Sequence, residues 1–308
     1  MPNLTTIKDE KNMPLAIIRG GHRDGEMVYF DEREREGALK IENLYDYIPD
    51  KEIRKQKKYM TTKEMLFLKD AFENNHIRDE VKSIYDNLKP TMDKEISKHI
   101  HINNGHFEII PLIKENQVQK CFISGQSGSG KSTWISNYAQ TYKKLFPNNS
   151  IYVISRHNED PVLDKIKGIK RLELDEEILE AEIDIEDFKD SLIILDDIET
   201  ISDKKINKLI TNLRDDLLQN CRHHNIYLCC VSHSILNYGY TRSLILESDL
   251  IVFFPRSGGY QIKRYLKEYQ GYNKEQINII MRLPSRWVCI NKNTYPPCVI
   301  SENDIYIL

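Results

Sequence analysis

The sequence of 308 residues contains no long apolar run, and none of its segments approaches the ~18 residues that a membrane-spanning helix needs. Its N-terminus also lacks the basic and apolar leader that is typical of a secretory signal. We therefore expect a soluble, intracellular protein with no membrane segment. Hydrophobic residues make up 40% of the chain and charged residues 30%, which suffices for one large domain or for one domain with an appendage.

Cysteine is scarce, with six residues and no Cys-x-x-Cys motif. The six are Cys121, Cys221, Cys229, Cys230, Cys289 and Cys298. Because several of them lie within apolar runs, we expect buried, reduced thiols. A zinc site formed by Cys221, His223 and His224 is an alternative, but this spacing matches no common zinc motif.

A strong excess of charge of one sign is also missing, since the formal net charge is −3. The chain therefore lacks the overall basic character of many nucleic-acid-binding proteins. A nucleic-acid partner would have to meet a local basic surface, such as the lining of a pore. The sequence also contains no internal repeat and no low-complexity segment.

The first hundred residues differ in pattern from the rest of the chain. Residues 14–30, "PLAIIRGGHRDGEMVYF", predict two short strands around a glycine-rich turn. A highly charged stretch follows, and the apolar spacing over residues 62–88 predicts helices. We therefore predict an N-terminal extension over residues 1–100, made of short strands and then a largely helical, charged part, and leave its role open.

Residues 101–308 show an α/β pattern. Apolar runs that predict strands lie at 106–113, 150–156, 191–200, 225–234 and 248–256. Helical spacing is clearest over residues 206–218, and the acidic stretch 171–190 predicts a helix and loops at the rim. Continuous apolar strands that alternate with helices predict a mainly parallel sheet covered by helices on both faces. Residues 286–308 predict short C-terminal strands.

The clearest motif is "CFISGQSGSGKSTWI" at residues 121–135. The spacing from Gly125 to Gly130, Lys131 and Ser132 fits a P-loop at every position, and an apolar strand precedes it, as the motif requires. The glycines let backbone N–H groups surround an anion, and the following helix adds its positive end. Lys131 would contact the β- and γ-phosphates of a nucleoside triphosphate, and the Ser132 hydroxyl suits Mg²⁺.

Two further strands end in polar residues that suit catalysis. The strand 191–200 leads into Asp196, predicted to hold Mg²⁺, and Asp197, predicted to polarise a water molecule. Glu199 remains an alternative for the second role. The strand 225–234 ends at His233 between two serines, where it can act as a sensor of the γ-phosphate or serve a structural purpose. The carboxyl ends of parallel strands meet at one edge of a sheet, so we expect these groups to meet the P-loop.

A resemblance to a known family rests on five segments in a fixed order. They are "GQSGSGKS", "LIILDDIET", "NLRDDLLQNCRHHNIYLCCVSHS", "SDLIVFFPRSGGYQIKRYLKEYQG" and "SRWVCINK". This order resembles the FtsK/HerA superfamily, and more closely the poxvirus-type genome-packaging ATPases of large DNA viruses and virophages. The resemblance covers about residues 105–308. The P-loop itself is generic, whereas the spacing of the other segments is more specific.

The resemblance implies a RecA-like core, a homo-oligomeric ring, usually a hexamer, and Mg²⁺-dependent ATP hydrolysis that moves double-stranded DNA into a preformed capsid. Capsid or portal-vertex proteins are implied partners, and the host cytoplasm, a virus factory or the virion are implied locations. The implied ATP contacts are Gly125, Gln126, Ser127, Gly128, Ser129, Gly130, Lys131, Ser132 and Thr133. The chain departs from many relatives at two positions. They have Gln as the sensor, where this chain has His233 between two serines, and they have Gly before the arginine of the "RH" segment, where this chain has Cys221.

Arg222 is our candidate for an arginine finger that acts on a neighbouring subunit. It lies just before the strand 225–234, at the end of that strand remote from its own nucleotide, and the resemblance also places a ring-interface arginine there. A surface arginine at a helix C-terminus is the alternative reading. Arg214 and Arg256 are further candidates for the finger.

Two other functions are compatible with a P-loop. A small-molecule kinase or a GTPase-like switch is one alternative, but the sequence shows no Asn-Lys-x-Asp guanine motif, no Leu-Ser-Gly-Gly-Gln signature and no arginine-rich lid. A scaffold that only binds nucleotide is the other, and the pair Asp196 and Asp197 argues against it. Stimulation of ATP hydrolysis by DNA would separate these functions.

Overall fold

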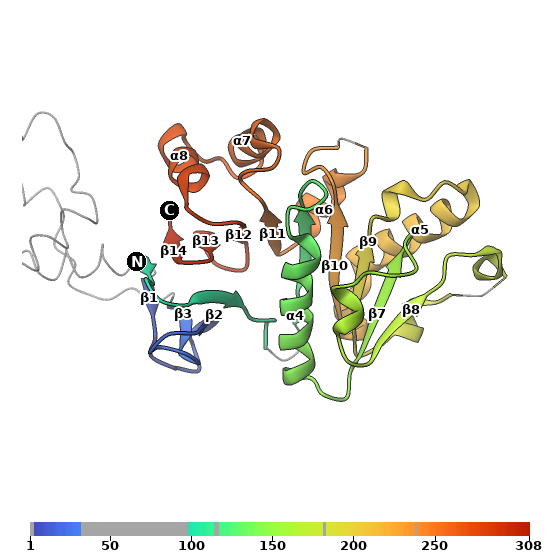
Figure 1. The fold of residues 1–308 in the computed structure, drawn as a ribbon, viewed down its shortest axis with the longest axis horizontal. Helices are drawn as coiled ribbons and strands as arrows, with labels where there is room; N and C mark the ends of the chain where they lie inside the picture. The colour runs from blue at the N-terminus through green and yellow to red at the C-terminus, as the bar shows by residue number, and fades with distance from the viewer. Residues whose placement is uncertain (1–2, 32–97, 114–116, 181–182, 238) are drawn as a thin grey trace, which may run out of the picture.

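The computed structural model describes residues 3–31, 98–113, 117–180, 183–237 and 239–308. These residues form a ten-stranded sheet, a smaller four-stranded sheet and the helices that cover the larger one (Figure 1). The larger sheet has the strand order β4-β14-β13-β12-β11-β6-β10-β9-β7-β8. None of the helices in the described ranges is long and apolar enough to cross a membrane.

The centre of the larger sheet is parallel, as the sequence predicts. Its strands are β6 (Lys120–Ser124), β7 (Ser150–Ser155), β8 (Ile169–Leu172), β9 (Ser191–Asp196), β10 (Ile226–Ser232) and β11 (Leu250–Phe253). Every residue of β10, and every residue of β9 before Asp196, is buried. Continuous burial explains why these strands are apolar runs rather than alternating ones.

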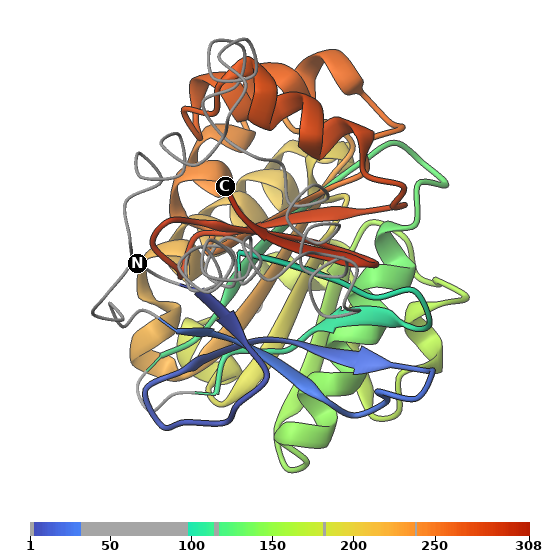
Figure 2. The same ribbon diagram turned by 90° about the vertical axis from the view of Figure 1, so that its left-hand side faces the viewer.

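Helices cover both faces of this parallel centre, which confirms the predicted architecture. Figure 2 shows α4 (Lys131–Leu145) on one face, with α5 (Lys204–Asn220) and α6 (Thr241–Glu247) on the other. The apolar spacing of α5 places Ile210 and Leu217 in the core, and the Asp203 carboxylate caps its first turn by accepting from two backbone N–H groups. Two further helices, α7 (Gly259–Glu268) and α8 (Lys274–Arg282), follow β11.

The sheet is mixed rather than wholly parallel, because its C-terminal strands pair antiparallel. They are β12 (Val288–Asn291), β13 (Cys298–Ser301) and β14 (Asp304–Ile307), and β4 (His99–His101) adds the edge strand. The short strands predicted for the tail are therefore confirmed. The six cysteines are buried free thiols, also as expected.

The four-stranded sheet corrects the prediction of a largely helical N-terminal extension. Its strands are β1 (Asn3–Thr5), β2 (Met13–Arg19), β3 (Met27–Asp31) and β5 (His106–Ile109), so the described part of the extension is sheet. The hairpin predicted over residues 14–30 is present, whereas the helices predicted over 62–88 lie outside the described residues. β2 pairs with β5 across the predicted boundary at residue 100.

The acidic stretch 171–190 also differs from its prediction of a helix and loops. It begins within β8 and continues as two short 3₁₀ turns, η3 (Glu176–Leu179) and η4 (Ile185–Phe188). Asp175 and Asp184 each accept a backbone N–H at the start of a turn, so the acidic side chains cap several short segments instead of lining one helix.

Candidate nucleotide-binding site

The P-loop connects β6 to α4 and has the backbone that its glycines predict. Gly128 and Gly130 adopt φ values of +74° and +114°, which side-chain-bearing residues rarely reach. A Cβ atom on Gly125 would lie 2.7 Å from Cδ2 of Phe254. The loop leads directly into α4, and the N-terminus of that helix can bind an anion. Thr133, in the first turn of α4, is exposed.

Lys131 lies at the centre of the charges in this site. Its side chain folds back so that Nζ donates to the carbonyl oxygens of Gly125 at 2.8 Å and Gln126 at 3.4 Å. Burial lowers the pKa of this ammonium below its ordinary value, while the negative charges of three acidic residues, the last residue of β9 and two that follow it, oppose that shift. These residues are Asp197, Asp196 and Glu199.

Strand register brings these charges to one edge of the sheet. Ser124 at the end of β6 stands opposite Ser232 at the end of β10, and Asp196 at the end of β9 stands opposite Ser155 of β7. The Gly125 N–H also donates to the Ser232 carbonyl at 3.1 Å. The structure therefore brings together the P-loop, the paired acids and the polar end of β10, as the sequence predicts.

Asp197 and His233 form a direct pair in this site. Oδ2 of Asp197 lies 3.0 Å from Nε2 of His233. Asp197 has a φ of 51°, an uncommon left-handed conformation for aspartate that costs local strain. Its other oxygen, Oδ1, is buried and has no hydrogen-bond partner among the described residues. A buried carboxylate oxygen without a partner is suited to accept a hydrogen bond from water or ligand.

Glu199 has a different set of contacts, which the sequence did not reveal. One of its oxygens accepts from the Ser232 hydroxyl at 2.8 Å, and the other accepts from the His233 backbone N–H at 3.1 Å. Ser234 in turn donates to Gln261 of α7 at 2.7 Å. Glu199 therefore holds the end of β10 in place, and its carboxylate is occupied by protein donors.

The Asp196 carboxylate binds a proton more tightly than an ordinary aspartate does. Burial, together with the negative charges of Asp197 and Asp160, raises the pKa of the Asp196 carboxyl to about 6, against an ordinary value of 3.8. Asp160 follows β7 and accepts from the Ser132 hydroxyl at 3.0 Å. Asp160 was not among the residues predicted from the sequence, because it lies in the loop beyond β7 and is not the last residue of a strand, as Asp196 is.

Two arginines lie beside the P-loop of the same chain. Nε of Arg286 donates to the Ser129 carbonyl at 3.0 Å. Arg286 and Arg256 line a cleft of about 570 Å³ together with residues 126–129. A second cleft, of about 560 Å³, lies between the loop, His233 and the start of α7. No short motif points to Arg286, because it lies 157 residues from the carbonyl that it contacts.

The structure does not bring Arg222 to this edge. It is exposed in the 3₁₀ turn η6 (Cys221–His224), which immediately precedes β10 and so lies at the opposite edge of the sheet. Arg214 is only 4% exposed, donates to Asp215, and packs with its guanidinium 4.6 Å from the centre of the Tyr240 ring. Cys221, His223 and His224, the alternative zinc ligands, are not brought together as a possible metal-binding group in the described part of the chain.

We predict that Asp196→Asn stabilises the nucleotide-free protein at pH 8. The folded-state pKa of Asp196 lies above its ordinary value, so the carboxylate destabilises the fold above about pH 6, and this penalty vanishes below about pH 4. We expect the free energy of unfolding to rise by about 1–3 kcal/mol at pH 8 and by almost nothing at pH 4. Urea denaturation of both proteins at the two pH values measures the difference.

The matched control is Glu159→Gln, which removes one negative charge from an exposed position in the neighbouring loop. We expect a change below about 0.5 kcal/mol from this control at either pH. Two results would contradict a destabilising Asp196 carboxylate. One is an increase in the free energy of unfolding from Asp196→Asn that is the same at pH 4 as at pH 8, and the other is a decrease at pH 8.

Comparison with known proteins gives one similar curated sequence and several solved structures of related fold. No protein-family profile matches it. Its fold is similar to that of the genome packaging NTPase B204 of Sulfolobus turreted icosahedral virus 2 in complex with ATP-gammaS, with a TM-score of 0.40, 15% identity, and coverage of 62% of this chain and 98% of B204. TcpA, the pCW3 conjugation coupling protein, gives a TM-score of 0.37 and 10% identity over 94% of this chain and 77% of TcpA.

Sequence similarity is much stronger to a virophage protein. Protein V3 of Sputnik virophage, itself uncharacterized, is 40% identical over 184 residues, which are 59% of this chain and 74% of V3. The relation to virophage proteins that the five segments indicated is thereby confirmed. On this identity and coverage, the chain belongs to the same protein family as V3 of Sputnik virophage.

Proposed function

We propose that this protein is an Mg²⁺-dependent ATPase that translocates double-stranded DNA and packages a viral genome into a preformed capsid. One observation carries the catalytic part of the proposal. Lys131 of the P-loop shares the carboxyl edge of the parallel sheet with the acidic residues at and beyond the end of β9 and with His233 after β10. This combination offers both a phosphate site and groups that can orient a water molecule.

The residues at this edge fit a bound Mg²⁺ ion. Ser132 and Asp196 would hold it, and both present oxygen, the donor that Mg²⁺ prefers. Burial and neighbouring carboxylates raise the pKa of Asp196, so a divalent cation would relieve an existing excess of negative charge. The ion, when bound, would neutralise charge on the β- and γ-phosphates.

Asp197 is the better candidate for orienting the attacking water. Its Oδ1 atom has no hydrogen-bond partner among the described residues, and its Oδ2 atom is held by His233. Both oxygens of Glu199, in contrast, accept hydrogen bonds from the end of β10. We assign Asp197 to the reaction and Glu199 to positioning Ser232 and His233.

The ring and its arginine finger are proposed from the contrast between three arginines. Arg214 is buried and bonded, and Arg256 lies beside the P-loop of its own chain. Arg222 is exposed at the edge of the sheet opposite the P-loop. From that position it could act only on the nucleotide of a neighbouring subunit, and the resemblance to packaging ATPases implies a homo-oligomeric ring, usually a hexamer.

The DNA, capsid and location parts of the proposal rest on the resemblance to packaging ATPases. The five sequence segments shared with packaging ATPases and the relation to a virophage protein support a role in packaging, with portal-vertex or capsid proteins as partners. Such a protein would act in the host cytoplasm or virus factory, or in the virion. With a net charge of −3, the ring would contact DNA through a local basic lining.

The function is tested by measuring ATP hydrolysis by the full chain with and without double-stranded DNA. We expect Mg²⁺-dependent turnover that DNA stimulates, and we expect Lys131→Ala to abolish turnover while circular dichroism shows an intact fold. A small-molecule kinase would ignore DNA, and a scaffold would not hydrolyse ATP. Unchanged turnover in Lys131→Ala would exclude the P-loop as the site of reaction.

The two carboxylates can be separated by conservative substitutions. We expect Asp197→Asn to bind ATP normally and to lower kcat by about 10²–10⁴, because it removes the group that orients water. Glu199→Gln should lower kcat less, since glutamine can still accept from Ser232 or His233. Normal turnover in Asp197→Asn with loss in Glu199→Gln would reverse the two assignments.

Arg222 is tested by mixing two inactive chains. Arg222→Ala and Lys131→Ala should each be nearly inactive alone, since a finger supplied in trans can contribute about 10³–10⁵ in rate. In mixed rings some interfaces pair an intact P-loop with an intact finger, so part of the activity should return. Arg242→Ala, at an exposed arginine of α6, should remain active alone. Full activity of Arg222→Ala, or no recovery in rings shown to be mixed, would exclude Arg222.

A further inference from the structure

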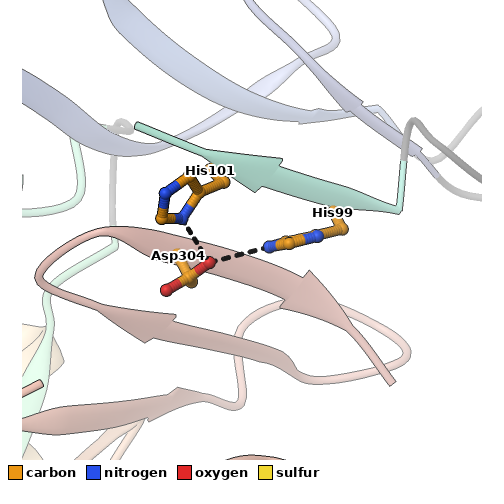
Figure 3. A group of neighbouring side chains, drawn as sticks. All are labelled: His99, His101 and Asp304. Atoms are coloured by element: carbon orange, nitrogen blue, oxygen red, sulfur yellow. Dashed lines mark hydrogen bonds and ion pairs between the residues drawn. The ribbon is translucent and has the colours of Figure 1, made fainter. Parts of the chain in front are cut away.

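A group of three side chains at the edge of the large sheet resembles a metal centre and plays no part in the proposed reaction. His99 and His101 of β4 converge with Asp304 of β14 on one point (Figure 3). We propose that these three residues bind Zn²⁺ or a similar first-row transition metal ion. Two imidazoles and one carboxylate are a donor set that zinc commonly uses.

Strand geometry explains how the three side chains meet. Residues two apart on a strand project from the same face, so both histidines of β4 point the same way. In the antiparallel pairing of β4 with β14, Asp304 stands opposite His101. Nε2 of His99 and Nδ1 of His101 each lie 2.8 Å from the same oxygen, Oδ1 of Asp304.

Asp304 is placed to serve as a ligand. Its side chain is only 6% exposed, and its Oδ1 atom faces one ring nitrogen of each histidine. The carboxylate therefore offers an oxygen donor at the point where the two imidazoles meet.

The surroundings of the two histidines resemble the outer contacts of a metal site. The His99 ring stacks on Tyr306, with ring centres 3.9 Å apart, which fixes its orientation. Nε2 of His101 lies 3.0 Å from Oδ1 of Asn103. If that nitrogen carries the proton of a neutral imidazole, the lone pair of Nδ1 faces the Asp304 carboxylate. A metal ion bound between them would be coordinated by both Nδ1 of His101 and the Asp304 carboxylate.

The site also provides access and a structural purpose. The His101 side chain is 44% exposed, which leaves a path for the ion and a fourth position for water. β4 follows residues 32–97 in sequence and forms the edge of the sheet. A metal held by β4 and β14 would fasten this edge strand to the C-terminal hairpin, independently of nucleotide binding.

The test is zinc binding by the full chain, stripped of metal with a chelator and free of nucleotide. Competition with a chromophoric chelator should show one Zn²⁺ per chain, and His101→Gln and Asp304→Asn should each weaken affinity by at least about 100-fold, since even an outer contact typically contributes 10–100-fold. His106→Gln, at an exposed histidine on β5, should leave binding unchanged.

Substitution with Co²⁺ gives a second measurement that does not depend on the variants. Wild-type protein should show visible absorption bands of a site with nitrogen and oxygen ligands, and these bands should disappear on adding one equivalent of Zn²⁺. The absence of stoichiometric zinc, or zinc affinity that survives both His101→Gln and Asp304→Asn, would show that the three residues form only a hydrogen-bonded group.

Discussion

The parallel pairing of β6 with β10, and of β10 with β9, is the constraint on which the nucleotide site depends. Because Ser124 lies level with Ser232, the P-loop begins beside the polar end of β10, and the Gly125 N–H bonds to the Ser232 carbonyl. The same register brings Asp196, Asp197 and Glu199 close enough for their negative charges to act on the Lys131 ammonium. A slip of one residue in either pairing would turn these side chains to the other face of the sheet.

The site holds more negative charge than its one buried lysine can balance. Three carboxylates lie in the field of Lys131, and Asp160 adds a fourth near Asp196. Burial, together with this excess of negative charge, raises the pKa of Asp196, and the strained backbone of Asp197 adds to the cost. Such a site is less stable alone than with cationic ligands, and stability given up in this way is typical of functional sites.

Local patterns predicted the parts of the site that lie within one strand and its following turn. The P-loop, Asp196, Asp197 and His233 could be found because parallel strands bring their carboxyl ends together. Contacts that join distant segments could not be found. The bond from Arg286 to the P-loop spans 157 residues, and that from His99 to Asp304 spans 205. For the same reason the pairing of β5 with β2, rather than with the large sheet, was not foreseen.

α5 joins the two places that the proposed ring must coordinate. Its N-terminus follows the loop that carries Asp197, and Asn207 on its second turn donates to backbone carbonyls of Ile198 and Ile201 in that loop. Its other end runs directly into η6, which carries Arg222. A helix of 17 residues spans about 25 Å. In the proposed ring, α5 would therefore directly connect the loop around Asp197 to Arg222, the proposed finger.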